Sequence, residues 1–90
     1  MAFETIHNFY ERAVFRAVLE ATREPGVAAD DEAIADMACV ALNRLPARYI
    51  RHDIDIAYYL TDAEREAMAQ AIKEAVEFAV AFVQQRSRED

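Results

Sequence analysis

The apolar residues in the first quarter of the chain recur at steps of three and four, the spacing of one face of an α-helix. This pattern predicts a helix from about Thr5 to Thr22, in which Thr5 or Asn8 could cap the start. Pro25 and Gly26 end it. The apolar positions are Ile6, Phe9, Tyr10, Ala13, Val14, Ala17, Val18 and Ala21, and Phe15 and Leu19 widen the apolar surface.

A second helix is predicted after Asp30 and Asp31, either of which can cap it. It runs to about Leu45, because Pro46 forces the preceding residue out of helical geometry. Apolar residues occupy nearly all of its faces, so we expect it to be the central and most buried helix. Cys39, the only cysteine, is expected to be buried within it as a small hydrophobic residue.

A third, long helix is predicted from the capping box Thr61-Asp62-Ala63-Glu64 to about Arg86. Its apolar residues form a heptad seam, but further apolar residues lie outside that seam. A monomer of this size cannot easily cover both sides, so we expect a homodimer. The seam comprises Met68, Ile72, Ala75, Ala79 and Phe82, and the residues outside it are Ala71, Val76, Phe78, Val80 and Val83.

Residues 47–60 are ambiguous, because Ile54, Ile56, Tyr58 and Leu60 alternate with their neighbours at the spacing of a strand. A single strand has no expected partner within the chain. It could pair with its copy in a dimer, form an extended loop, or be a helical turn with aromatic anchors, which we favour. The prediction is therefore one all-α domain over residues 1–90, with three to four helices.

Charge and hydropathy exclude several classes of protein. The net charge of −7 comes from 17 acidic and 10 basic residues, which disfavours binding to a nucleic acid polymer. No apolar run reaches the roughly 18 to 20 residues that cross a bilayer. The first residues lack the apolar core of a signal peptide, so we expect a cytoplasmic protein without a membrane-bound part.

The arginines that follow the second helix form the most informative pattern. No acidic residue lies between Asp36 and Asp53, and this window contains Arg44, Arg48 and Arg51. Guanidinium groups bind phosphate through two parallel hydrogen bonds and stack on flat rings such as purines. The residues therefore suit a phosphorylated purine ligand, to which Asn43 and Tyr49 add neutral hydrogen-bonding groups. Alternatively, the arginines pair with Asp36, Asp53 or Asp55 and fix the turn.

Catalysis and metal binding find little support. His52, Asp53 and Asp55 match no metal-ligand spacing, and His7 could join them only through folding. A single cysteine excludes a multi-cysteine zinc site. The chain has neither a nucleophile with a matched base nor a glycine-rich loop, so we expect no enzyme, no cofactor and no metal.

Two segments resemble the late competence development protein family, ComFB. Asp36 stands seven residues before Asn43, as in that family, and 42–46 (LNRLP) and 48–50 (RYI) match its motif. The segment 7–11 (HNFYE) is similar to the family's N-terminal motif. The resemblance covers about residues 7–50.

The chain also departs from the family pattern. The CxxC pair of many members would fall at Asp30 and Ala33, so the ligands of their zinc are absent. The usual double proline is Pro46-Ala47, and the long terminal helix is unlike the shorter ends of the cysteine-containing members. The chain resembles a cysteine-free branch.

The resemblance implies a small helical homodimer linked to competence and type IV pilus regulation, which binds a cyclic dinucleotide, notably cyclic di-GMP. It implies no enzyme activity. The alternative is an adaptor domain that binds an unknown protein partner and no small molecule. The expected ligand-binding residues are Asp36, Asn43, Arg44, Arg48 and Tyr49, which match the motif, together with Arg51. The alternative for Asp36 is that it braces the arginines.

Overall fold

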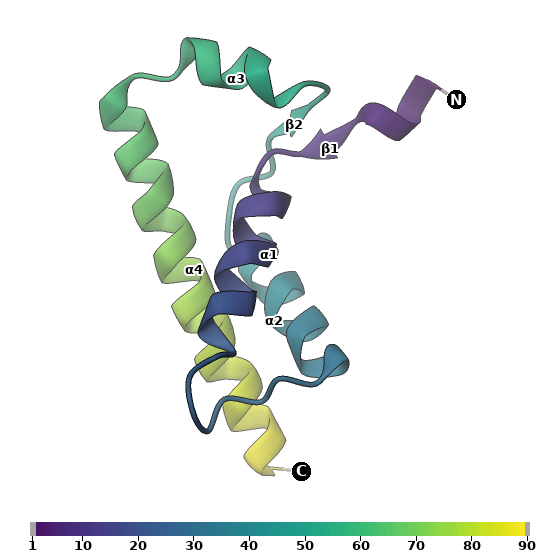
Figure 1. The fold of residues 1–90 in the computed structure, drawn as a ribbon, viewed down its shortest axis with the longest axis vertical. Helices are drawn as coiled ribbons and strands as arrows, with labels where there is room; N and C mark the ends of the chain where they lie inside the picture. Colours follow the sequence, from purple (N-terminus) through teal and green to yellow (C-terminus); the bar gives the residue numbers. More distant parts are fainter. Residues whose placement is uncertain (1, 90) are drawn as a thin grey trace.

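The computed structural model describes residues 2–89, without the side chains of residues 55, 57 and 87–89. Within this range the chain forms four α-helices and one two-stranded sheet (Figure 1). This confirms the predicted all-α class with a long C-terminal helix. The elements are η1 (Ala2–Thr5), β1 (His7–Asn8), α1 (Tyr10–Ala21), α2 (Asp31–Asn43), β2 (Tyr49–Ile50), α3 (Asp53–Tyr59) and α4 (Asp62–Glu89).

The core lies where α1, α2 and α4 pack against one another. Met37 of α2 and Val14 and Val18 of α1 are fully buried, each contributing roughly 1.5–3 kcal/mol by leaving water. Small residues of α4 complete the core, which allows the helices to approach closely. The buried cluster comprises Tyr10, Val14, Val18, Ala33, Met37, Ala38, Ala41, Leu45, Ala75, Val76, Ala79 and Val83.

The start of α4 follows the predicted capping box. The Glu64 backbone N–H donates to the Thr61 hydroxyl at 3.1 Å, as expected for this motif. The same hydroxyl donates to the Glu64 carboxylate at 3.2 Å, which replaces the usual return bond to the threonine backbone. Sequence reasoning therefore placed this boundary correctly.

The prediction that the first helix begins near Thr5 was wrong. Thr5 ends η1, and His7 and Asn8 form β1, so α1 begins only at Tyr10. Asn8 prevents an earlier start of the helix, because its buried side-chain oxygen accepts the Tyr10 backbone N–H at 3.2 Å. Asparagine side chains often compete with the helix in this way.

Residues 47–60 contain both a helical turn and a strand. The favoured helical turn is confirmed as α3, but its anchor is buried Ile56 rather than an aromatic residue, since Tyr58 and Tyr59 are exposed. The alternating residues from Ile54 to Leu60 form no strand, and the strand of this region lies earlier, at Tyr49–Ile50, where no strand was predicted. Strand β2 pairs antiparallel with β1, aligning His7 with Ile50 and Asn8 with Tyr49.

Cys39 is exposed, which corrects its predicted burial. It lies three residues after Asp36 and four before Asn43, so the three side chains share the outer side of α2. Helix α2 does contact both α1 and α4, but only one of its faces is covered. The many alanines of α2 place apolar residues on nearly all of its faces, so the sequence does not reveal which face is covered.

The fold is open at one end. In Figure 1, α4 diverges from α1 and α2 toward α3, which links it to β2. The radius of gyration is 14.4 Å, against about 12 Å for a compact domain of this length. Within residues 2–89, no helix is long and apolar enough to span a membrane.

The predicted heptad seam of α4 is only partly internal. Ala75 and Ala79 are buried in the core, whereas Phe82 is 41% exposed and stacks on Phe78, which is 42% exposed. Two phenylalanine rings one helical turn apart therefore form an uncovered apolar surface.

Asn8→Ala is expected to lower the free energy of unfolding by about 1–3 kcal/mol, because two backbone N–H groups would lose their acceptor. Urea denaturation measures this difference. Asn43→Ala is the matched control: its amide is exposed, so its effect should stay within about 0.5 kcal/mol. Equal losses in the two variants would contradict the role assigned to Asn8.

Candidate ligand-binding site

The turn after α2 is held by local hydrogen bonds and one buried side chain. The Asn43 side-chain amide donates to the Cys39 carbonyl at 2.9 Å, and the Arg44 backbone N–H donates to the Ala41 carbonyl at 3.1 Å. Buried Leu45 then anchors the chain before Pro46. These contacts hold the predicted site residues Asn43 and Arg44 at the end of α2.

Arg44 does not extend freely into solvent. The central carbon of its guanidinium group lies 3.8 Å from the centre of the Phe78 ring, a cation–π contact worth about 0.5–1 kcal/mol at an exposed site. The Phe78 ring stacks in turn on Phe82, at 5.9 Å between centres. Arg44 thus connects the end of α2 to the uncovered surface of α4.

Arg48 is positioned by its backbone, which bonds the N-terminal segment. Its N–H donates to the Asn8 side-chain oxygen at 3.2 Å, and its carbonyl accepts the Phe9 N–H at 2.7 Å. Tyr49 follows in β2 and is 70% exposed. The side chains of Arg48 and Arg51, one residue before and two residues after Tyr49, are also exposed.

The alternative that these arginines pair with Asp36 or Asp53 was wrong. Among the side chains that the structure describes, neither aspartate pairs with Arg44, Arg48 or Arg51. Asp36 is exposed on α2, about 10 Å along the helix from Asn43, and does not brace them. The side chain of Asp55 lies outside the described residues.

Asp53 instead binds His7, 46 positions earlier. The His7 Nε2 lies 2.9 Å from the Asp53 carboxylate, and Nδ1 lies 3.0 Å from the Thr5 carbonyl. Both partners are acceptors, so the imidazole satisfies both only when it carries two protons. The Arg12 guanidinium approaches the other oxygen of Asp53 at 3.7 Å.

This geometry shifts both groups toward their charged forms. The hydrogen bond to Asp53, then that to the Thr5 carbonyl, raises the pKa of His7 above 6.5. The hydrogen bond from His7 lowers the pKa of Asp53 below 3.8. The pair joins β1 to α3 through this hydrogen bond. Among the described residues, no group of three side chains that could ligate a metal occurs.

The His7–Asp53 pair predicts a pH-dependent stability. A raised histidine pKa stabilises the fold fully below about pH 6.5, and this contribution is lost as pH rises through the folded value. A lowered aspartate pKa stabilises the fold above about pH 4 and is lost as pH falls through the folded value. The gap in thermal midpoint between the wild type and Asp53→Asn should therefore be widest between about pH 4 and 6.5. A gap that is constant from pH 4 to 9 would contradict this.

The arginine window, between Asp36 and Asp53, and the N-terminal segment 7–11 are also the parts of the chain that carry a family motif. The family model described as Late competence development protein ComFB matches residues 7–87, nearly the whole chain. No curated protein and no solved structure matches the chain. Membership suggests a competence-related regulatory domain, in a family not known for enzymes. The chain thus belongs to the ComFB family.

Proposed function

We propose that this chain is a non-enzymatic regulatory module that binds a cyclic dinucleotide, cyclic di-GMP, on the surface formed by Arg48, Tyr49 and Arg51. Ligand binding would control competence or behaviour that depends on type IV pili. Arg44, Asn43 and Asp36 extend the same site along the end and outer side of α2.

The observation that carries this proposal is a pair of exposed arginines free of carboxylates in a strongly acidic chain. Arg48 and Arg51 have no ion-pair partner among the described side chains, although the net charge is −7. Each guanidinium can therefore take a phosphate in two charge-assisted hydrogen bonds. The exposed Tyr49 ring, which follows Arg48 in the sequence, offers a flat face for a base.

The turn after α2 supplies groups that suit a guanine. Phe78 covers one face of the Arg44 guanidinium, which leaves the opposite face for a purine ring. The side-chain oxygen of Asn43 has no described donor, because its only hydrogen bond uses the amide nitrogen. It therefore offers an acceptor for a guanine N–H group, whereas the exposed Asp36 carboxylate, about 10 Å away along α2, would contact another part of the ligand.

We further propose that the module acts as a homodimer. The open shape of the chain and the uncovered Phe78–Phe82 rings leave apolar surface that a second copy would bury. The contact of Arg44 with Phe78 would then link the ligand site to the dimer surface, so that binding of one ligand could alter the contact between copies.

Arg48→Ala is expected to weaken cyclic di-GMP binding by about 1.5–3 kcal/mol, the contribution of a hydrogen bond to a charged group. The thermal midpoint should change little, because the Arg48 side chain is exposed. Arg48→Lys should restore little of the lost affinity, since lysine keeps the charge but lacks the planar guanidinium group. Isothermal titration calorimetry and thermal melting measure the two effects.

Arg16→Ala serves as the control, because it removes the same charge from an exposed position on α1. It should leave the affinity unchanged. Absence of cyclic di-GMP binding to the wild type, or equal losses in Arg16→Ala and Arg48→Ala, would refute the proposed site.

Phe82→Glu is expected to split the dimer, because dimer formation would bury a charge without a partner. Sedimentation at low micromolar concentration should give twice the 10.2 kDa chain mass for the wild type and the chain mass for the variant. Since Phe82 is partly exposed, the variant should keep its helical circular dichroism. A monomeric wild type would contradict the homodimer.

A further inference from the structure

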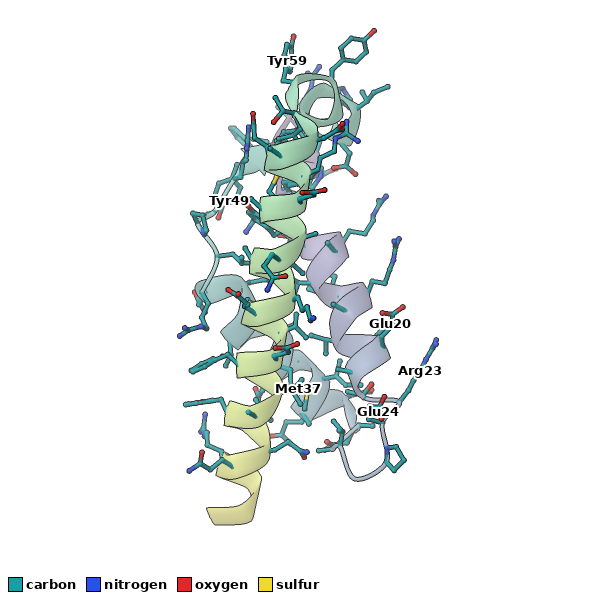
Figure 2. All side chains as sticks on the ribbon, turned by 90° about the vertical axis from the view of Figure 1, so that its left-hand side faces the viewer. Glu20, Arg23, Glu24, Met37, Tyr49 and Tyr59 are labelled. Atoms are coloured by element: carbon teal, nitrogen blue, oxygen red, sulfur yellow. The ribbon has the colours of Figure 1, made fainter. Side chains whose placement is uncertain are left out.

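A groove runs between α1 and α4, away from the arginine window. It consists of two adjoining hollows of about 690 and 440 Å³, which share Ala21 at the end of α1, Glu24 in the turn after it, and Val76 and Glu77 of α4. In Figure 2, the labelled Glu20 and Glu24 lie on the opposite side of α4 from Tyr49. The groove is therefore a separate surface, which the proposed nucleotide site does not use.

The base of the groove is apolar, and hydrogen bonds hold the loop that closes one of its ends. Ala17, Ala21, Val76 and Val80 line it, and their short side chains allow another backbone to come close. At one end, the Gln84 side chain accepts the Ala28 backbone N–H at 3.1 Å and donates to the Gly26 carbonyl at 3.4 Å. These bonds hold the loop after α1 against α4, so the groove exists before any partner binds.

The rim of the groove is acidic. Glu20, Glu24 and Glu77 line it, against a single basic lining residue, Lys73. Within the described part of the chain, none of the three glutamates has an ion-pair partner. Arg23, in the turn after α1, does not line either hollow. Three carboxylates thus face solvent around an apolar base.

From this arrangement we infer that the groove docks a basic amphipathic α-helix of a partner protein. The lining of α4 extends from Ala69 to Gln85, which is about 24 Å or four helical turns at 1.5 Å per residue. That length suits a helix of about 16 residues whose apolar side enters the groove. Arginine or lysine at the edges of that helix would meet the three glutamates.

A second copy of this chain is a poorer occupant of the groove. A two-fold contact through it would bring the three glutamates of one copy toward those of the other, and like charges that meet at an interface are destabilising. Phe78 and Phe82, the rings of the proposed dimer surface, do not line the groove. The groove therefore stays open in the proposed homodimer.

The test uses a synthetic 16-residue helical peptide with leucines at positions i, i+3, i+4 and i+7 and arginines on the remaining faces. A second peptide keeps the leucines and replaces each arginine with glutamate. In calorimetric titration of the full chain at physiological salt, the basic peptide should bind and the acidic one should not.

Three variants locate the contact. The double variant Glu24→Lys with Glu77→Lys reverses the rim and should weaken binding at least 10-fold. Ala81→Trp fills the groove without changing charge and should weaken it similarly, at an exposed position that tolerates the larger side chain. Glu66→Lys makes the same type of charge change at an exposed position of α4 outside the groove, and should leave affinity within about twofold.

Three results would overturn the inference: no binding of the basic peptide, equal losses in Glu66→Lys and the rim variant, or unchanged affinity in Ala81→Trp. A rim variant that sediments at a different mass from the wild type would assign the groove to contacts between copies and overturn it as well. The peptide test does not involve cyclic di-GMP, so its failure is distinguishable from failure of the proposed nucleotide site.

Discussion

Two distant parts of the chain meet at the side chain of Asn8. Its oxygen accepts the backbone N–H groups of Tyr10, two positions later, and of Arg48, 40 positions later. This one buried acceptor ends β1, sets the start of α1 and fixes where the chain leaves Pro46. An apolar side chain in its place would leave both donors unpaired, which is why the segment depends on asparagine.

The position of the candidate site follows from that constraint. Arg48 is tied to the N-terminal segment by its backbone, and its side chain is exposed, as is that of the next residue, Tyr49, in β2. The Asp53 carboxylate, which is the nearest in sequence to Arg51 and His52, is bound to His7 instead. Consequently the local positive charge of the window is not neutralised by Asp53, and it stays available to an anion.

Periodicity and capping predicted the three long helices, since local sequence determines both. The start of α4 at the Thr61–Glu64 box and the end of α2 before Pro46 are examples. The strand pair escaped prediction because it is only two residues long on each side and joins residues far apart in sequence. Cys39 was misplaced because alanine-rich helices do not reveal which face is covered. The contact between Arg44 and Phe78 also depends on packing alone. For the N-terminal segment there was a signal, because the occurrence of both family motifs in one chain indicated that residues 7–11 and 42–50 lie close together in the fold.

The central claim is that the arginine window, freed by the ties at Asn8 and His7, is a nucleotide-binding surface. A titration of the ¹⁵N-labelled chain with cyclic di-GMP, followed by two-dimensional NMR, tests it most directly. The account predicts saturable shifts of the backbone amides and arginine side-chain signals from Asn43 to His52, with the α1–α4 groove unaffected. Shifts confined to that groove, or no shifts at millimolar ligand, would contradict it.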